Sequence, residues 1–481
     1  MVSQQQERED KFDVDVGFVV PELTDLLPVE GRLETATYRL NNTYYDTSDR
    51  DLQRLHLTLR QRVGGPDAGW HLKIPSGPAR TEIRSKSRSR SVPRALADPL
   101  LGVRRGQELA PVASLSVTRD VVRLLTASGD LVAEVADDFV ESATMGETST
   151  LQSWREVEVE LGPAGDESTL RVIGDRLLDW GARRSPFASK LKRALGSDGD
   201  QTPGRDLETL GGLVGEYIAA QCLAIYSGDL GIRLNQTVVH PTRVGVRRLR
   251  STLRIFSPLF DADKAAALEE ELIWFAGLLG EVRDRDILRD RLLGQVAELP
   301  GEYVLGPVAS QIESTLQLER SRYLKRVVQE MQGDRYRQLL DTVNEWWTAP
   351  PFTEQASQPS AGVSGYVRRA ERKLNKRLRN AGGDVEALHR ARKAGKRFRY
   401  AAELSEPTLG KKASKAVKEG KRLQELLGEH QDSVVSAAFL RRLGAAAGAS
   451  PDQNGFTFGI LLANEWHRAE KIRHQLAKRY G

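Results

Sequence analysis

The stretch His240–Arg254, HPTRVGVRRLRSTLR, decides the fold of the C-terminal half of the chain. Basic residues follow His240 at positions +3, +7, +8, +10 and +14, and at about 100° per residue they fall on one side of a helix. Val246, Leu249 and Leu253 project from the other side. Solvated helices usually mix both signs of charge. The stretch therefore predicts an amphipathic helix whose polar face carries only cations.

The same pattern recurs in His389–Arg399, HRARKAGKRFR. In each copy, a Leu-Leu-Gly-Glu motif and then an aspartate follow about forty residues after the histidine, within 278–284 and 426–432. Two motifs kept in register over that distance predict an internal duplication of a helical unit. The expected repeats are 207–348 and 366–481, and the Pro-, Ser- and Gly-containing stretch between them is their connection.

Two such helices would line one anion-binding surface, with arginine forking onto phosphate oxygens and lysine acting as a point charge. The alternative is a pair of plain solvated basic helices. Nucleic acid is the competing ligand, but its readers normally place aromatic platforms among their cations, and tyrosines such as Tyr400 lie outside the two motifs. The pattern therefore favours a dense phosphate polymer. The candidate binding residues are His240, Arg243, Arg247, Arg248, Arg250, His389, Arg392, Lys396, Arg397 and Arg399.

These two motifs resemble the CHAD family, the conserved-histidine α-helical domain, over about residues 207–481. The resemblance implies a duplicated helical bundle that binds inorganic polyphosphate. It also suggests association with polyphosphate granules.

Composition sets further limits. The chain has 481 residues, enough for two or three domains, and a formal net charge of +5. Residues 1–200 carry an acidic excess and the remainder a basic one, so an acidic half that could hold metal precedes a basic half that could hold an anion. Cys222 is the only cysteine, which excludes a disulfide framework and a thiolate metal site. No signal peptide or membrane-spanning apolar run is apparent, so we expect a soluble, cytoplasmic protein without a membrane partner.

The N-terminal half shows the two-residue alternation of strands. Glu7, Glu9 and Lys11 alternate, so in a strand all three face the same way. Charged and apolar residues also alternate in 56–62, 70–75, 80–84, 118–124, 131–139 and 155–161. Each strand alone could belong to an ordinary half-buried antiparallel sheet whose charges face water.

The signs of these charges are segregated along the chain. The first and last segments are rich in carboxylates, whereas the middle ones are rich in arginine and lysine. A closed barrel with a charged lumen would place an acidic cluster beside a basic one. This arrangement suits a metal-bound triphosphate, with carboxylates holding Mg²⁺ or Mn²⁺ and cations holding phosphoryl oxygens. We therefore expect an α+β multidomain chain, with an antiparallel β-barrel or tunnel in 1–195, a linker in 196–206 and an all-α bundle in 207–481.

These alternating residues resemble the CYTH domain of the triphosphate tunnel metalloenzymes, over roughly residues 1–195. The opening E-x-E-x-K, the paired arginines, the closing E-x-E and the late S-K-x-x-R (189–193) all match in order. Asp138 best matches the family's acid in the sixth strand, although Asp137 is adjacent. The resemblance implies catalytic residues Glu7, Glu9, Lys11, Asp138, Glu158 and Glu160, of which the carboxylates would hold metal. The implied substrate-binding residues are Lys11, Arg60, Arg62, Lys73, Arg119, Arg123, Lys190 and Arg193.

The resemblance implies hydrolysis of an inorganic or nucleoside triphosphate, and two alternatives stay open. The barrel could be a catalytically idle part of a polyphosphate-binding protein, or it could cyclise ATP as a class IV-type adenylate cyclase, because hydrolysis and cyclisation use the same residue types. The stretch Arg84–Arg94, RSKSRSRSVPR, is unusually basic for a barrel segment. We expect it to be a loop or an additional anion contact.

Overall fold

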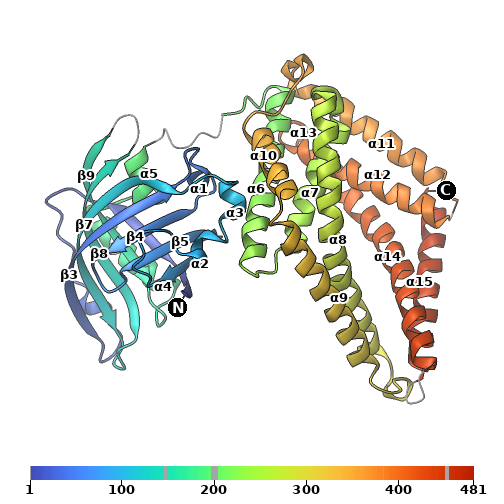
Figure 1. The fold of residues 1–481 in the computed structure, drawn as a ribbon, viewed down its shortest axis with the longest axis horizontal. Coiled ribbons are helices and arrows are strands. Elements are labelled where there is room, and N and C mark those ends of the chain that lie inside the picture. Colours follow the sequence, from blue (N-terminus) through green and yellow to red (C-terminus); the bar gives the residue numbers. More distant parts are fainter. Residues whose placement is uncertain are drawn as a thin grey trace. The chain divides into compact units, whose positions relative to one another are not determined.

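The computed structural model describes residues 2–77, 79–145, 149–196, 204–382, 384–449 and 454–480. The chain divides into two compact units, Met1–Thr202 and Pro203–Gly481. We call them the sheet unit and the bundle (Figure 1). Most of the expected linker, residues 197–203, lies outside the described residues.

The sheet unit is built on one antiparallel sheet, as the two-residue alternation predicts. In the described part of the unit its strand order is β1-β6-β5-β4-β3-β7-β8-β9-β2-β10. The strands are β1 Val2–Glu7, β2 Glu9–Asp13, β3 Arg32–Asp46, β4 Thr58–Val63, β5 Gly69–Ser76, β6 Ala79–Ser85, β7 Ala110–Leu125, β8 Leu131–Thr144, β9 Leu151–Leu161 and β10 Arg183–Arg184. Every segment in which we predicted alternation forms part of a strand.

The expected closed barrel is wrong in one respect, because the hydrogen-bonded sheet is not closed. Strand β1 pairs only with β6, and β2 pairs with β9 and β10. Arg8 alone separates β1 from β2 in the chain, and its carbonyl oxygen accepts a 2.9 Å hydrogen bond from the amide of Leu161. The chain therefore crosses from one side of the sheet to the other at Arg8, and no continuous ladder joins the two sides.

Two longer helices of the sheet unit pack against the strands. Helix α4 (Glu167–Asp179) buries Ile173 and Leu177 against Phe12 and Val157. Helix α5 (Lys190–Leu195) buries Leu191 among residues of β3, β7 and β9, and the hydroxyl of Ser189 caps it by accepting from the amide of Lys192. Packing of α5 places Lys190 against the sheet. The remaining helices are the short α1 Asp51–Arg54, α2 Arg94–Ala97 and α3 Leu101–Arg104.

The bundle is helical throughout its described core. The first repeat contains α6 Leu210–Arg233, α7 Val239–Ile255, α8 Ala262–Glu298, α9 Val308–Glu330 and α10 Asp334–Thr348. The second contains α11 Val363–Arg379, α12 Val385–Leu404, α13 Glu406–Leu409, α14 Lys411–Gly448 and α15 Phe456–Tyr480.

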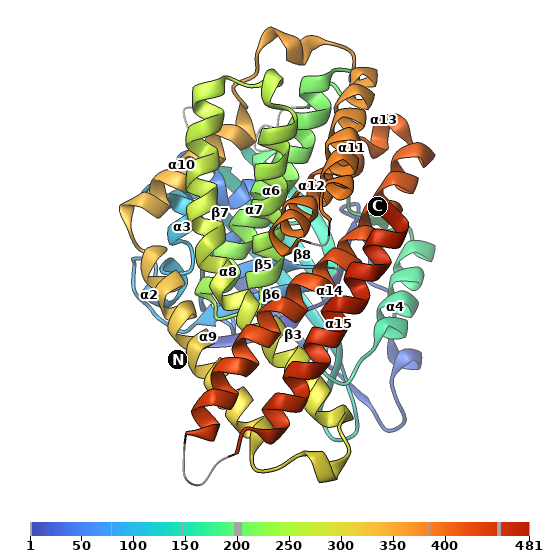
Figure 2. The ribbon, with the colours of Figure 1, turned by 90° about the vertical axis from the view of Figure 1, so that its right-hand side faces the viewer.

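The two repeats pack their equivalent helices against each other. Helices α7 and α12, which carry the two basic motifs, are in contact, and the long pairs α8–α9 and α14–α15 extend from them (Figure 2). Leu292 and Ile312 of the first repeat share a core with Leu440 and Leu461 of the second. Within the described residues, no helix has the length and apolar character needed to cross a membrane.

Candidate functional site

The strands of the sheet unit enclose a cavity of about 780 Å³. Inward-facing residues from both ends of the sheet line it, because alternate side chains share one face of each strand. Ten lysine and arginine side chains face six acidic ones, so the cavity has an excess of four positive charges. The charged lining residues are Glu7, Arg8, Glu9, Lys11, Arg60, Arg62, Asp67, Lys73, Arg80, Arg84, Arg119, Arg123, Glu134, Glu158, Glu160 and Lys190.

One part of the wall carries carboxylates. Glu160 lies opposite Glu9 on one neighbouring strand and opposite Glu134 on the other. No hydrogen bond or ion pair joins the Glu160 side chain to another described residue, and burial, together with the charges of Glu7 and Glu9, raises its pKa to about 7. Burial would raise the pKa of Glu9 as well, but Lys11 and Lys73 lower it to about 2. Among the described residues, Glu160 is therefore a carboxylate of this wall without an ion pair, and Lys73 only partly offsets the rise of its pKa.

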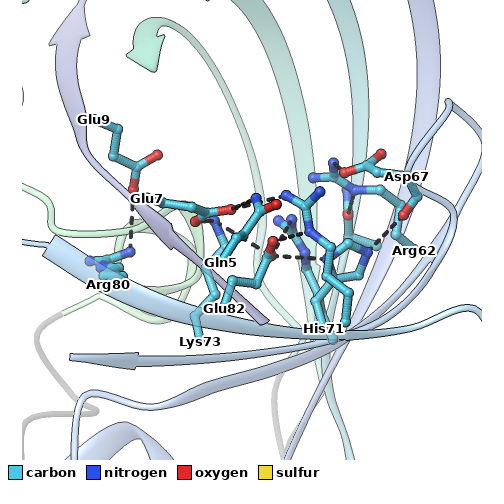
Figure 3. A network of polar contacts seen from close by, with 12 residues as sticks. Gln5, Glu7, Glu9, Arg62, Asp67, His71, Lys73, Arg80 and Glu82 are labelled. Carbon is cyan, nitrogen blue, oxygen red and sulfur yellow. Dashed lines mark hydrogen bonds and ion pairs between the residues drawn. The ribbon is translucent and has the colours of Figure 1, made fainter. Parts of the chain in front are cut away.

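Another part of the wall carries cations held by one buried acid, Glu82, which is fully inaccessible to solvent. Its carboxylate pairs with Arg84 and lies 3.8 Å from both Arg60 and Lys73. Lys73 also forms a 2.5 Å ion pair with Glu7. Figure 3 shows these side chains converging from β1, β4, β5 and β6. Glu82 thus fixes three cations of the cavity wall.

His71 joins this acid to the turn between β4 and β5. Its Nδ1 lies 2.9 Å from Oε1 of Glu82, and its Nε2 lies 2.8 Å from the carbonyl oxygen of Asp67 (Figure 3). A carbonyl oxygen can only accept, so the contact with Asp67 places a proton on Nε2, and burial lowers the pKa of His71. The carboxylate of Asp67 in turn accepts a 2.5 Å hydrogen bond from Arg62. The buried imidazole of His71 therefore links Glu82, which holds Arg60, Lys73 and Arg84, to Asp67, which holds Arg62.

The third group is a compact ion network at the base of α5. Arg119 donates two 2.7 Å hydrogen bonds to Asp138 and one of 2.8 Å to Glu158. Lys190 lies within 2.8 Å of oxygens of Asp138, Glu156 and Glu158. Burial would raise the pKa of Glu158, but the surrounding cations, Lys11 first, hold it well below its ordinary value.

The structure distinguishes between the two adjacent aspartates. Asp138 faces the inner network, whereas Asp137 bonds Arg155 on the other face of β8. Asp138 is fully buried behind Arg119 and does not line the cavity. Arg193 also lies outside the lining, because its guanidinium bonds Asp13 at 2.7 Å and lies over the ring of Trp154. The other residues expected from the CYTH resemblance all line the cavity.

Sequence reasoning missed several members of the site. Strand β3 was not predicted, and it contributes Tyr38 and Tyr44 to the lining. Alternation on β6 was recognised, but Arg80, Glu82 and Arg84 were given no role. The sequence did contain a signal for them. The three residues share one face of β6, carry both signs of charge and lie beside Lys73 of the neighbouring strand β5.

The family resemblance implies a divalent cation. The donor set fits Mg²⁺ or Mn²⁺ chemically, because carboxylate oxygens are the preferred ligands of hard cations and the Glu160 carboxylate forms no ion pair with a described residue. In the described part of the chain, no three Asp, Glu, His or Cys side chains are already gathered at metal-binding spacing. The carboxylates of Glu7, Glu9 and Glu158 are instead paired with lysine or arginine.

In the bundle, the contact between α7 and α12 brings the two basic motifs together. Arg243 and Arg247 from α7 and Arg392 from α12 surround the ammonium group of Lys396. Burial first, and then these guanidinium groups, lower the pKa of Lys396 to about 6. Arg250, Arg392, Lys396 and Arg397 make no hydrogen bond or ion pair with other described residues. The contact between α7 and α12 therefore brings cations of the two motifs together, and a shared anion-binding surface stays a prediction.

The single-sign face is partly neutralised by acids from other helices, which the sequence pattern did not reveal. Arg243 pairs with Asp284 of α8 at 2.8 Å, and Gly280, one turn earlier, leaves space for its guanidinium. A Cβ atom at Gly280 would lie 3.2 Å from Nη2 of Arg243. In the second repeat a Cβ atom at Gly428 would lie 3.8 Å from Nη2 of Arg392, which is an ordinary contact. The glycine of the Leu-Leu-Gly-Glu motif thus lies beside one motif arginine in each repeat, closely only in the first.

The repeats differ at the far end of the two helices. The residue fourteen positions after the motif histidine is Arg254 in α7 and Glu403 in α12. Glu403 pairs with Arg248, whereas Arg254 pairs with Glu269 of α8 and lies near Arg397. One end of the α7–α12 contact is therefore closed by an ion pair between the helices, and the other end keeps an excess of cations.

Comparison with known proteins agrees with both halves. A model of the CYTH domain matches residues 7–185, and a model of the CHAD domain matches residues 216–441. CYTH domains are typically triphosphate tunnel metalloenzymes. Uncharacterized protein MT2285 of Mycobacterium tuberculosis (strain CDC 1551 / Oshkosh) is 32% identical over 499 residues, covering 98% of this chain and 94% of that protein. The chain belongs to the family of proteins in which a CYTH domain precedes a CHAD domain.

Two solved structures are also similar. PptA from Streptomyces chartreusis is 22% identical with a TM-score of 0.47, covering 56% of this chain and 98% of that one. The CHAD domain from the plant Ricinus communis is 25% identical with a TM-score of 0.44, covering 57% and 94%.

Proposed function

We propose that the sheet unit hydrolyses the phosphoanhydride bond of a linear triphosphate with the help of Mg²⁺ or Mn²⁺. The observation that carries this proposal is the divided wall of the cavity. The lining residues carry a formal excess of four positive charges, before the buried acids behind them are counted, which suits a polyanionic substrate, and a separate carboxylate wall includes Glu160 without an ion pair among the described residues. The membership of the CYTH family supports the same reaction class.

The cations would bind and orient the phosphate chain. Arg60, Arg62 and Lys73 are fixed by Glu82, Asp67 and His71, so their positions are set before the substrate arrives. Arg119 and Lys190 would bind further oxygens, and Asp138 would hold both in position from behind. Fixed donors of this kind can stabilise charge that develops on phosphoryl oxygens without reorganising.

Glu7, Glu9, Glu158 and Glu160 would hold the divalent cation, which neutralises phosphate charge and lowers the pKa of a bound water. No serine, cysteine or histidine among the lining residues is placed as a nucleophile with an adjacent base. Water is therefore the attacking group in this proposal.

We further propose that the bundle binds inorganic polyphosphate across α7 and α12. Four motif cations without an internal partner supply the binding charge, and Arg247 and Arg243 add to it. Tyr400, the aromatic residue beside the motif, is buried, and its ring makes cation–π contacts with Arg247, Arg248 and Arg399. It therefore offers no platform for a nucleobase.

The enzymatic proposal is tested with the purified full chain and Mg²⁺ or Mn²⁺. Tripolyphosphate, ATP and long-chain polyphosphate are offered, and phosphate, pyrophosphate and cyclic AMP are measured. We expect phosphate or pyrophosphate release that Glu160→Gln abolishes. The control Glu141→Gln alters an exposed carboxylate on β8 and should leave turnover unchanged. Full turnover in Glu160→Gln would refute the metal-site assignment, and cyclic AMP as the main product would replace the hydrolase with a cyclase.

The binding proposal is tested with two triple variants. Arg247, Arg248 and Arg250 are replaced by serine in one, and Lys396, Arg397 and Arg399 in the other. Each should weaken polyphosphate binding and flatten its salt dependence, since fewer counterions are released. Combining the two should weaken it further, because both faces hold one ligand. Wild-type affinity in both variants, or equally tight binding of single-stranded DNA at the same phosphate concentration, would contradict the proposal.

A further inference from the structure

The basic stretch between β6 and α2 belongs neither to the cavity lining nor to the bundle. Residues 86–93 form no helix or strand, and Lys86, Arg88, Arg90 and Arg94 are all exposed. None of these four cations forms an ion pair or hydrogen bond with another described residue. The stretch from 84 to 94 contains no acidic residue. We call residues 86–94 the basic segment.

The backbone of the basic segment is held in place by the serines that alternate with its cations. The amides of Ser87, Ser89 and Ser91 donate to the hydroxyl oxygens of Ser85, Ser87 and Ser89, at 3.4, 3.2 and 3.1 Å. The carbonyl oxygen of Ser89 accepts 3.0 Å hydrogen bonds from Gln61 and from the buried Trp70. The Ser89 carbonyl anchors the segment to β4 and β5, whereas the side chains of Ser89 and Ser91 are exposed, as are the alternating cations.

The basic segment starts at the cavity. Arg84, the last inward-facing residue of β6, lines the cavity, and Pro66 and Asp67 of the β4–β5 turn line it at the same end of these strands. Lys86 follows directly and passes against Gly69, where an added Cβ atom would lie 3.3 Å from the Cα atom of Lys86. Gly69 has φ +144°, which also favours glycine. A row of cations therefore continues from the cavity wall onto the outer surface.

A row of like charges on a fixed backbone has no favourable electrostatic interaction within the protein. Such charges repel each other, and salt screens this repulsion. A polyanion laid along the row replaces this repulsion with attraction and releases counterions. The ligand that suits the row is one whose end is already held in the cavity, because binding along the row then becomes an intramolecular event.

We propose that the basic segment binds the part of a linear polyphosphate chain that extends out of the cavity, so that long-chain polyphosphate is a better substrate of the sheet unit than tripolyphosphate. This inference rests on the proposed hydrolase function. In this proposal tripolyphosphate is bound by the cations of the cavity alone, whereas a long chain contacts both the cavity and Lys86, Arg88 and Arg90.

The test compares the full-length wild type with the variant Lys86→Ser/Arg88→Ser/Arg90→Ser. The control Arg171→Ser/Arg183→Ser/Arg184→Ser removes the same charge from exposed positions of α4 and β10 that do not line the cavity. We measure kcat/KM for tripolyphosphate and for long-chain polyphosphate at several salt concentrations. Circular dichroism melting checks that each variant folds.

We expect the basic-segment variant to lose about tenfold in kcat/KM on long chains, with a shallower salt dependence, and to keep tripolyphosphate turnover. In the control variant, the ratio of kcat/KM for long-chain polyphosphate to kcat/KM for tripolyphosphate should equal that of wild type. The bundle is the same in all three proteins, so it should not alter this ratio. An unchanged ratio in the basic-segment variant, or an equal loss on both substrates, overturns the inference alone. If wild type cleaves neither substrate, the proposed function fails and the inference fails with it.

Discussion

Replacing Glu160 by glutamine should stabilise the metal-free sheet unit at alkaline pH. The pKa of Glu160 is raised from an ordinary value of 4.5 to about 7, first by burial and then by Glu7. The folded state therefore binds more protons than the unfolded state between these values, and stability falls as pH rises through this window. At 1.36 kcal/mol per pKa unit, the penalty above pH 7 is at most about 3 kcal/mol. Glutamine has the same shape and carries no charge, so it removes the penalty.

The measurement is amide hydrogen exchange of β9 in the full chain with a chelator present, corrected for intrinsic rates, at pH 5 and pH 8. We expect Glu160→Gln to slow exchange at pH 8 and to have little effect at pH 5. Divalent cations should protect wild type more than the variant, because they bind the ionised carboxylate. Glu141→Gln, on the exposed face of β8, is the control. Equal protection of wild type and Glu160→Gln at pH 8 would refute the account of Glu160 as an uncompensated charge.

Three further predictions concern both units. Polyphosphate binding should take up a proton between pH 6 and pH 8 and tighten as pH falls, because burial and Arg392 lower the pKa of Lys396 to about 6. Calorimetry in buffers of different ionisation enthalpy measures this proton uptake. The variant Lys396→Arg should abolish it. Gly280→Val should weaken polyphosphate binding about fivefold by displacing Arg243. The control Gly277→Val should not weaken it, because nothing lies within 4 Å of a Cβ atom added there. Equal affinities of the two variants would show that the position of Arg243 does not depend on Gly280. His71→Ala should destabilise the sheet unit by about 2–4 kcal/mol, since Glu82 and the carbonyl of Asp67 lose their hydrogen-bond partner. In thermal unfolding, His71→Asn should cost less. An unaltered melting temperature in His71→Ala would show that His71 does not link Glu82 to Asp67.

The helices of the bundle could be predicted because each carries a long periodic pattern. The duplicated motif also predicted which helices would form one surface, and α7 and α12 do lie together. The counter-charges could not be predicted in the same way. Asp284 and Glu403 are far in sequence from Arg243 and Arg248, and which of the many acids reach the motif depends on packing between helices.

Alternation predicted the charged strands of the sheet unit and failed for β3. Its inward residues Tyr38, Leu40 and Tyr44 carry no charge signature, although this strand pairs with both β4 and β7. Closure of the sheet could not be read from alternation either, since period two continues from Glu7 to Lys11 across the break at Arg8. The convergence of Lys190 on three acids of β8 and β9 depends on where α5 docks, which no local pattern records.

The crossing at Arg8 has a consequence for biosynthesis. The N-terminal strands leave the ribosome first, yet β1 pairs with residues 79–85 and β2 pairs with residues 156–160. At about 5–20 residues per second, β2 waits on the order of ten seconds or more for its partner strand to be made. Contacts of such large sequence separation also close slowly. Glu9 and Lys11 are therefore synthesised long before the residues of β9 against which they lie in the cavity wall.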